Sequence, residues 1–284
     1  MPEIAINTRQ SVIMVLAILG LWPDVGTGAT RCDDNLICIT EQKKDAAVEL
    51  LATNRAAFPV SLSISARLRN YRAEPKRSLS TVLEAGERRR IMRLEPRDEK
   101  RAGSYRYWFE ASPGRLEAVH HDHYLYRLPY QAGRSYRVLQ GFGSRFSHKG
   151  VNRYAVDFKM PVGTPVHAAR GGIVVKVESR HDRGCWERGC GKYANYIVIL
   201  HDDGTTGEYY HLRQDGAVVE PNQRVRTGQH IGYSGNTGHT TLPHLHFAVY
   251  RPRPWGEFES MPIRFRSQDG VISAPRHGGR YVAD

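Results

Sequence analysis

The sequence predicts an all-β protein: an N-terminal antiparallel β-sandwich-like domain followed by a compact antiparallel β-sheet domain. Short segments of β-prone residues recur along the chain between turn-forming residues. In residues 60–66, for instance, apolar and serine side chains alternate with the period of a half-buried strand. No convincing amphipathic helix separates the strand-like segments of the second half. A length of 284 residues allows two domains, each with a core of its own.

Composition supports a folded, basic protein. Hydrophobic residues make up 40% of the chain and charged residues 25%, which argues against wholesale disorder. The formal net charge of +12 predicts attraction to a polyanion: nucleic acid, an anionic membrane or an acidic cell-wall polymer. The sequence has no RNP, helix-turn-helix or zinc-finger spacing, so we do not expect nucleic acid as a partner.

The N-terminus has the order of a secretory signal peptide. Arg9 precedes an apolar run over residues 12–22, and small residues follow at 25–29. We predict a signal peptide over residues 1–29 with cleavage after Ala29, and an uncleaved anchor is the alternative. Nothing later in the chain is apolar enough for a transmembrane helix, so we expect an exported protein in the periplasm or outside the cell.

Four cysteines fit an oxidising destination. Cys32 is close to Cys38 in sequence, and Cys185 is close to Cys190, so local pairing gives the simplest two disulfides. A structural zinc held by all four is the alternative, although neither pair has CxxC spacing.

Residues 30–130 read as the accessory, sandwich-like domain. The aromatic-rich segment 104–110 is β-prone, segment 47–52 is apolar enough for a strand or a helical turn, and residues 85–87 and 112–114 resemble turns. Next to this domain's end, residues 120–123 read His-His-Asp-His. Because neighbouring residues of an extended chain face opposite ways, only His121 and His123 could converge on a metal there.

Residues 131–266 read as the second domain, and residues 267–284 as a basic C-terminal tail. Within this second domain, the sequence predicts a hairpin turn at residues 202–204 and an insertion at 180–192 that contains two of the cysteines. The predicted strands cover residues 171–177, 195–200, 208–212, 229–233 and 261–265.

A pair of histidines follows a glycine-rich turn near the end of this domain. His244 and His246 are separated by one residue at the start of a strand-like segment, so both side chains point to one face. An isolated pair of this kind is typical of ordinary strand histidines, and the rest of the chain decides its meaning.

Several further motifs precede this pair in a fixed order. They are Ser147-His148-Lys149-Gly150, Tyr154-Ala155-Val156-Asp157-Phe158, Gly163-Thr164-Pro165-Val166, the Gly-x-Val segment 171–175, Tyr209-Tyr210-His211-Leu212, Gly235-Asn236-Thr237-Gly238 and His244-Leu245-His246-Phe247. From about Gln140 to Tyr250, the chain resembles the lysostaphin/LytM-type zinc metallopeptidases, which cleave peptide bonds of bacterial peptidoglycan.

The resemblance implies one Zn²⁺ per chain, held by His148, Asp157 and His246. It also implies that His211 and His244 perform acid/base chemistry on a zinc-activated water. Three N and O ligands leave a position for water, as a catalytic zinc site requires. The expected function is therefore an exported zinc metalloendopeptidase with peptidoglycan as its partner. A non-catalytic wall-binding module or amidase activator on the same fold is the alternative, and the presence of all five residues favours catalysis.

One departure from the family pattern concerns His148. Eight residues separate it from Asp157, where the most familiar family members have three, and we interpret the difference as a longer loop. His167 and His201 are expected to be structural, and His181, His230 and His239 to lie in loops or on the surface. The cysteine-bearing insertion is either a wall of the substrate groove or a solvated loop. The sequence leaves open the bond cleaved, the Gram type of the host, the oligomeric state and the role of the N-terminal domain.

Overall fold

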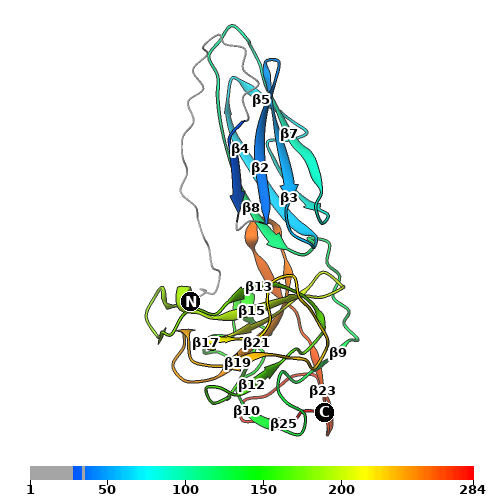
Figure 1. Cartoon of the computed structure of the whole chain (residues 1–284), viewed down its shortest axis with the longest axis vertical. Helices are drawn as coiled ribbons and strands as arrows, with labels where there is room; N and C mark the ends of the chain where they lie inside the picture. Colours follow the sequence, from blue (N-terminus) through cyan, green and yellow to red (C-terminus); the bar gives the residue numbers. More distant parts are fainter. Residues whose placement is uncertain (1–27, 34–35) are drawn as a thin grey trace. The chain divides into compact units, whose positions relative to one another are not determined.

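The computed structural model describes residues 28–33 and 36–284. The predicted signal peptide lies outside them, apart from residues 28 and 29. The described chain is divided into two compact units, which we call the first and second units (Figure 1). The first comprises residues 28–116 with the short segment Pro252–Glu257, and the second comprises Glu117–Arg251 and Phe258–Asp284.

The first unit consists of two antiparallel sheets. One sheet has the strand order β1-β2-β3-β7-β5, and the other has β6-β4-β8. Leu50 on β3 and both Leu62 and Ile64 on β4 are fully buried, so both sheets contribute apolar faces to a core. The strands are β1 Thr30–Asp33, β2 Ile37–Lys44, β3 Ala47–Asn54, β4 Val60–Arg69, β5 Tyr71–Glu74, β6 Ser78–Leu83, β7 Arg88–Pro96 and β8 Ser104–Pro113.

The second unit is built on one large antiparallel sheet with the order β18-β13-β15-β16-β21-β11-β10-β25, to which β22 adds by pairing with β21. Three small sheets complete it, with the orders β12-β19-β17, β14-β20 and β24-β23-β9. The strands are β9 Leu125–Arg127, β10 Ser135–Gln140, β11 Val156–Phe158, β12 Pro165–His167, β13 Gly172–Glu178, β14 Gly184–Cys185, β15 Tyr196–Leu200, β16 Thr206–Tyr210, β17 Leu212–Ala217, β18 Arg224–Val225, β19 His230–Ser234, β20 Gly238–His239, β21 Leu245–Pro252, β22 Phe258–Ser260, β23 Arg264–Ser267, β24 Gly270–Ile272 and β25 Arg280–Val282.

The predicted all-β class is confirmed. Helical structure in the described residues is limited to three short 3-10 helices, which are η1 Gly150–Asn152, η2 Cys190–Tyr193 and η3 Pro254–Gly256. Segment 47–52, which the sequence left between strand and helical turn, lies in strand β3. No helix in the described part of the chain has the length and apolar character to cross a membrane.

Two predicted strands have different limits in the structure. The segment 208–212 breaks after Tyr210 because His211 adopts the left-handed conformation, with φ of 65°, and the chain turns there into β17. Segment 261–265 contains only the start of a strand, since β23 begins at Arg264. Residues 267–284 include β24 and β25, and β25 pairs with β10 at the edge of the large sheet.

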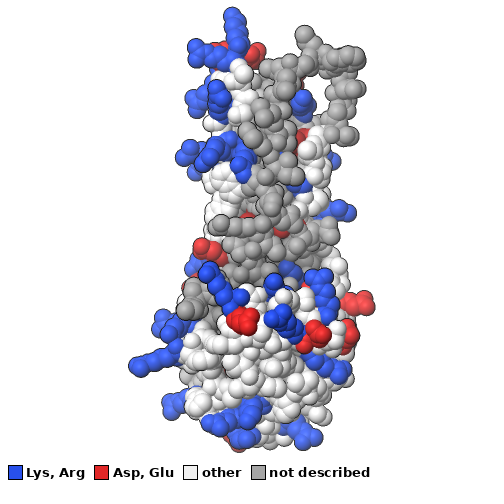
Figure 2. All heavy atoms as spheres, turned by 90° about the vertical axis from the view of Figure 1, so that its left-hand side faces the viewer, with Lys and Arg blue, Asp and Glu red and all other residues white. Residues whose placement is uncertain are grey.

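The predicted disulfides are both present. Cys32 is bonded to Cys38 and Cys185 to Cys190, so no free cysteine remains for a structural zinc. Basic side chains are distributed over the surface of both units, as Figure 2 shows for one face, in keeping with the net charge of +12.

Candidate functional site

One row of the large sheet brings two of the three candidate metal ligands together. Asp157 on β11 is directly opposite Gln140 on β10 and, on its other side, opposite His246 on β21. His246 is in turn opposite Tyr210 on β16. Residues directly opposite one another project from the same face of a sheet. The strand register thus places four side chains that are distant in sequence side by side on one face.

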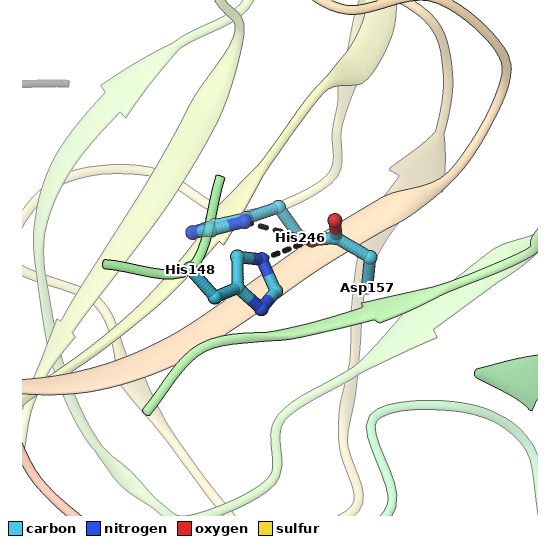
Figure 3. Close-up of side chains that lie close together, drawn as sticks. All are labelled: His148, Asp157 and His246. Carbon is cyan, nitrogen blue, oxygen red and sulfur yellow. Dashed lines mark hydrogen bonds and ion pairs between the residues drawn. The ribbon is translucent and has the colours of Figure 1, made fainter. Parts of the chain in front are cut away.

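The centre of the site is the buried carboxylate of Asp157. Its Oδ1 lies 2.8 Å from Nδ1 of His246 and 3.2 Å from Nε2 of His148 (Figure 3). Donor atoms of the three residues lie within 4.8 Å of one another, and all three side chains are buried. Within residues 28–33 and 36–284, this is the one such group of three or more His, Cys, Asp or Glu side chains able to hold a metal ion.

The loop before β11 positions His148. The eight residues that separate it from Asp157 include η1, and the side chain still reaches the carboxylate. Nδ1 of His148 is 3.0 Å from the carbonyl oxygen of Gly141, so Nδ1–H donates and Nε2 keeps its lone pair. Nε2 is buried and makes no hydrogen bond, and its close polar neighbour is Oδ1 of Asp157 at 3.2 Å. A metal ion would satisfy this nitrogen, which is why the residues present fit a metal centre.

The two candidate acid/base histidines lie beside this centre. The rings of His211 and His244 are 4.5 Å apart, and Nε2 of His244 is 3.9 Å from Oδ1 of Asp157. His211 follows the end of β16, and its left-handed backbone turns the chain at that point. The structure therefore brings together all five residues that the family resemblance implied: His148, Asp157, His211, His244 and His246.

Both of these histidines are held in one tautomer by backbone carbonyls. Nδ1 of His211 is 2.7 Å from the carbonyl of Thr237, and Nδ1 of His244 is 2.8 Å from that of Leu242. Because a carbonyl can only accept, each ring donates its Nδ1–H and leaves the Nε2 lone pair available. Gly238, next to Thr237, has a φ of 83°, and a Cβ there would lie 2.6 Å from the Cβ of Ala194. Only glycine fits this turn.

The charges of the site are set by burial and by mutual contacts. Burial by itself raises the pKa of Asp157, but contacts with His148 and His246 outweigh it and hold the pKa well below its ordinary value. For His148, burial is outweighed by Asp157, and the pKa is raised. Burial lowers the pKa of His246, and burial together with His244 and His246 holds the pKa of His211 well below its ordinary value. His211 is thus a neutral imidazole, as a proton acceptor must be.

Gln140 is a site residue to which sequence reasoning assigned no role. Its Nε2 donates to Oδ2 of Asp157 at 2.6 Å and to the hydroxyl of Ser147 at 2.8 Å. Its Oε1 accepts from the Ser144 hydroxyl and the Ser147 N–H. Gln140 therefore ties the carboxylate to the loop that carries His148. In the sequence, the one indication of a role for Gln140 is its position just before the loop that carries His148. Its contact with Asp157 is revealed only by the pairing of β10 with β11.

The remaining histidines lie elsewhere in the second unit. His120 is buried and contacts Asp122 at 2.9 Å, while His121 is mostly exposed, so the 120–123 segment brings no three ligands together. His201 is buried and contacts the hydroxyl of Thr205, and the His167 and His230 rings lie near each other. His239, expected in a loop or on the surface, is half-buried and packs on the exposed Trp186 with ring centroids 4.2 Å apart.

The second unit is an all-β domain with a His/Asp/His group that could hold a metal ion. The model of Peptidase family M23 matches residues 151–257, a segment that includes Asp157, His211, His244 and His246 and begins just after His148. This part of the chain is an M23 peptidase domain, and the resemblance inferred from the motifs is confirmed.

Three curated relatives are similar to this domain. Peptidoglycan DD-endopeptidase ShyA of Vibrio cholerae serotype O1 is 36% identical over 130 residues, covering 44% of this chain and 27% of the relative. Glycyl-glycine endopeptidase ALE-1 of Staphylococcus capitis is 42% identical over 115 residues, covering 40% and 29%. Lysostaphin of Staphylococcus simulans is 35% identical over 136 residues, covering 46% and 24%. The chain thus spans less than a third of the length of each of these relatives.

Proposed function

We propose that this protein is an exported zinc metalloendopeptidase that hydrolyses peptide bonds of bacterial peptidoglycan. The observation that supports it most directly is the convergence of His148, Asp157 and His246, with donor atoms within 4.8 Å, beside two histidines whose Nδ1–H groups donate to backbone carbonyls. The names of the relatives ShyA and ALE-1, a peptidoglycan and a glycyl-glycine endopeptidase, support the substrate class.

His148, Asp157 and His246 would hold the zinc through two imidazole nitrogens and a carboxylate oxygen. This set has the three protein ligands typical of catalytic zinc sites, which keep another position open. When bound there, zinc would polarise the scissile carbonyl and lower the pKa of a water molecule.

His244 and His211 would handle the proton during hydrolysis. The Nε2 lone pair of His244, which faces the ligand carboxylate, accepts a proton as the water oxygen bonds to the carbonyl carbon. The same nitrogen then donates that proton to the leaving amine as the C–N bond breaks. His211, whose ring is 4.5 Å from that of His244, offers a second Nε2 that can share the proton.

Export is proposed on two grounds. Both disulfides of the structure would be stable in an oxidising compartment, and the sequence of residues 9–29 has the order of a signal peptide. The net charge of +12 would favour accumulation on an anionic wall.

The first prediction concerns the acid/base pair. We expect His244→Ala and His211→Ala to retain one zinc per chain but to reduce release of new amines from purified peptidoglycan by about 10²-fold or more, because general acid/base catalysis typically contributes that much. Zinc is measured by elemental analysis, and His230→Ala, which removes a partly buried histidine outside the site, is the control.

Two outcomes would reject the proposal. A wild-type protein that binds zinc but cleaves no peptidoglycan would point to a non-catalytic wall-binding or activating module. A wild-type protein that binds no zinc would mean that the His148/Asp157/His246 group is not a metal centre.

A further inference from the structure

Two large aromatic side chains form an exposed pair in the second unit. Phe146 is 65% exposed and Trp186 is 51% exposed. Their rings are stacked, with centroids 5.2 Å apart and planes inclined by 13°. Trp186 also contacts the ring of His239, so the indole is fixed in place while much of both aromatic surfaces remains in water. We call Phe146 and Trp186 the aromatic platform.

Backbone contacts place the platform at the rim of the metal centre. Phe146 is two residues before His148, in the loop that Gln140 holds through Ser144 and Ser147. Trp186 lies within the loop closed by the Cys185–Cys190 disulfide.

That disulfide-closed loop pairs with the strand beside the acid/base histidines. β14 pairs in parallel with β20, and the N–H of Thr240 donates to the carbonyl of Cys185 at 3.0 Å. The Thr240 hydroxyl is 3.4 Å from Nδ1 of His244. The residue before β20, Thr237, accepts the Nδ1–H of His211. Trp186 is therefore connected through β14 and β20 to the acid/base histidines, and Phe146 lies in the loop that carries the proposed ligand His148.

The exposure of the platform indicates a ligand rather than a structural brace alone. Apolar surface left in water is unfavourable by about 25 cal/mol per Å². If Phe146 and Trp186 served only to hold two loops together, their rings could be buried, as other aromatic rings of this unit are. Contiguous exposed apolar surface rimmed by polar residues often marks a place where another molecule packs.

The chemistry around the platform fits a sugar ring. A pyranose has a face of C–H groups that can pack on an aromatic ring, and an edge of hydroxyl and acetamido groups that needs hydrogen bonds. In the sequence, Arg145 and Ser147 flank Phe146, and Glu187 and Arg188 follow Trp186, so residues able to form hydrogen bonds are adjacent in the chain to both rings. Two rings also match one or two sugars better than the much broader surface of a protein partner.

We propose that Phe146 and Trp186 bind an amino sugar of the glycan strand next to the peptide being cleaved. This inference rests on the proposed function for the identity of the polymer. It adds that the protein holds its substrate through the glycan as well as through the peptide. A binding site for the peptide stem is the rival hypothesis, and a peptide-free probe separates the two.

The test titrates the zinc-loaded protein with a tetramer of β-1,4-linked N-acetylglucosamine and follows tryptophan fluorescence. We expect saturable binding by the wild type, weakened roughly three- to tenfold by Phe146→Ala and by Trp186→Ala, if a sugar packs on each ring about as strongly as a second aromatic ring does, at about 0.5–1.5 kcal/mol. Trp186→Tyr retains an aromatic face and should bind more tightly than Trp186→Ala. The matched control is Trp108→Ala, because Trp108 is 43% exposed and belongs to the first unit.

A second arm measures cleavage. With the alanine variants we expect a higher KM for intact peptidoglycan, an unchanged kcat, and unchanged cleavage of a cross-linked peptide without sugars. Equal loss on the sugar-free peptide would assign the platform to the peptide stem and overturn the proposal. So would a tetramer that fails to bind the wild type or binds Trp186→Ala equally well. Because the binding arm needs no catalysis, an inactive wild-type protein would refute the proposed function, while tetramer binding would still test the platform.

Discussion

The residues of the proposed metal centre are oriented by partners that are not themselves ligands. Gln140 contacts Oδ2 of Asp157, and Oδ1 faces His148 and His246. The backbone carbonyl of Gly141, one residue further on, accepts the Nδ1–H of His148. Two consecutive residues of the chain thus fix the orientation of two of the three proposed ligands. Such partners fix the geometry and the tautomer of ligands before the metal arrives.

A prediction about zinc affinity follows from Gln140. We expect Gln140→Ala to weaken zinc binding about 10- to 100-fold, the usual effect of losing a residue that orients a ligand. Competition with a chromophoric chelator measures the dissociation constant. Gln223→Ala, which alters an exposed glutamine elsewhere in this unit, is the control. An unchanged zinc affinity would show that Asp157 is held without Gln140.

A second residue-scale prediction concerns His201, which is buried near Arg170, Asp203 and His120. Burial, with the nearby positive charge of Arg170, lowers the pKa of His201 to about 3. In the unfolded chain its pKa is about 6.5, so between these values the unfolded state binds more protons. Stability due to the neutral His201 is therefore complete above about pH 6.5 and decreases as the pH falls.

From pH 7 to pH 5 this one residue should reduce the free energy of unfolding by about 2 kcal/mol, at 1.36 kcal/mol per pH unit below 6.5. Urea unfolding at both pH values measures it. In His201→Gln the difference between the two pH values should shrink by about that amount, whatever the variant's absolute stability. A variant with the full wild-type difference would show that other groups cause the acid sensitivity.

At the scale of elements, the Cys185–Cys190 disulfide constrains the loop between β13 and β15. The bond between Cys185 and Cys190 closes the turn between β14 and η2, and β14 pairs with β20 next to Thr237 and Thr240. Opening the bond should increase the freedom of this loop. We therefore expect this loop to form part of the substrate groove.

The two disulfides offer a matched comparison. We expect the double variant Cys185→Ser/Cys190→Ser to reduce cleavage of peptidoglycan by about tenfold, since small displacements of positioning groups can cost up to about 10²-fold. Cys32→Ser/Cys38→Ser, which removes the bond in the first unit, should leave cleavage by the folded protein unchanged. Initial rates at equal folded concentration are compared. Equal rates for wild type and the Cys185/Cys190 variant would reject the groove hypothesis.

At the scale of the whole molecule, each unit has its own core. Fully buried Ile37, Leu50 and Leu62 belong to the first unit, whereas Phe158 and Phe247 belong to the core of the second. Separate cores allow the units to unfold in separate transitions. Only the second contains the proposed zinc ligands.

Calorimetry should therefore resolve two transitions, of which chelation shifts one. At free zinc 100-fold above its dissociation constant, binding stabilises the second unit by about 2.7 kcal/mol. Its removal should lower the Tm of that transition by about 5–10 °C. Leu62→Ala, which opens a cavity in the first unit and costs about 2–5 kcal/mol, should lower the other transition. A single transition that responds to both changes would contradict independent units.

Much of the architecture could be predicted because strands and turns are local. Alternation over residues 60–66 and the turn at residues 202–204 both correspond to structure, in β4 and between β15 and β16. Local sequence could not indicate that His211 would end its strand, because its backbone conformation is set by the change of direction from β16 into β17. Nor could it indicate that residues 280–282, read as part of a tail, would pair with β10 at the sheet edge.

The sequence by itself determined the all-β class, the disulfide pairing that proximity allowed, and the five histidine and aspartate positions of the candidate site. The class and the disulfides follow from strand periodicity and cysteine spacing, and the five positions follow from the family resemblance that the ordered motifs carry. Only the tertiary structure decided that Gln140, Asp157, His246 and Tyr210 form one row, and that Phe146 meets Trp186 beside it. Strand register and loop packing join residues up to about a hundred positions apart, and no local pattern encodes which of them become neighbours.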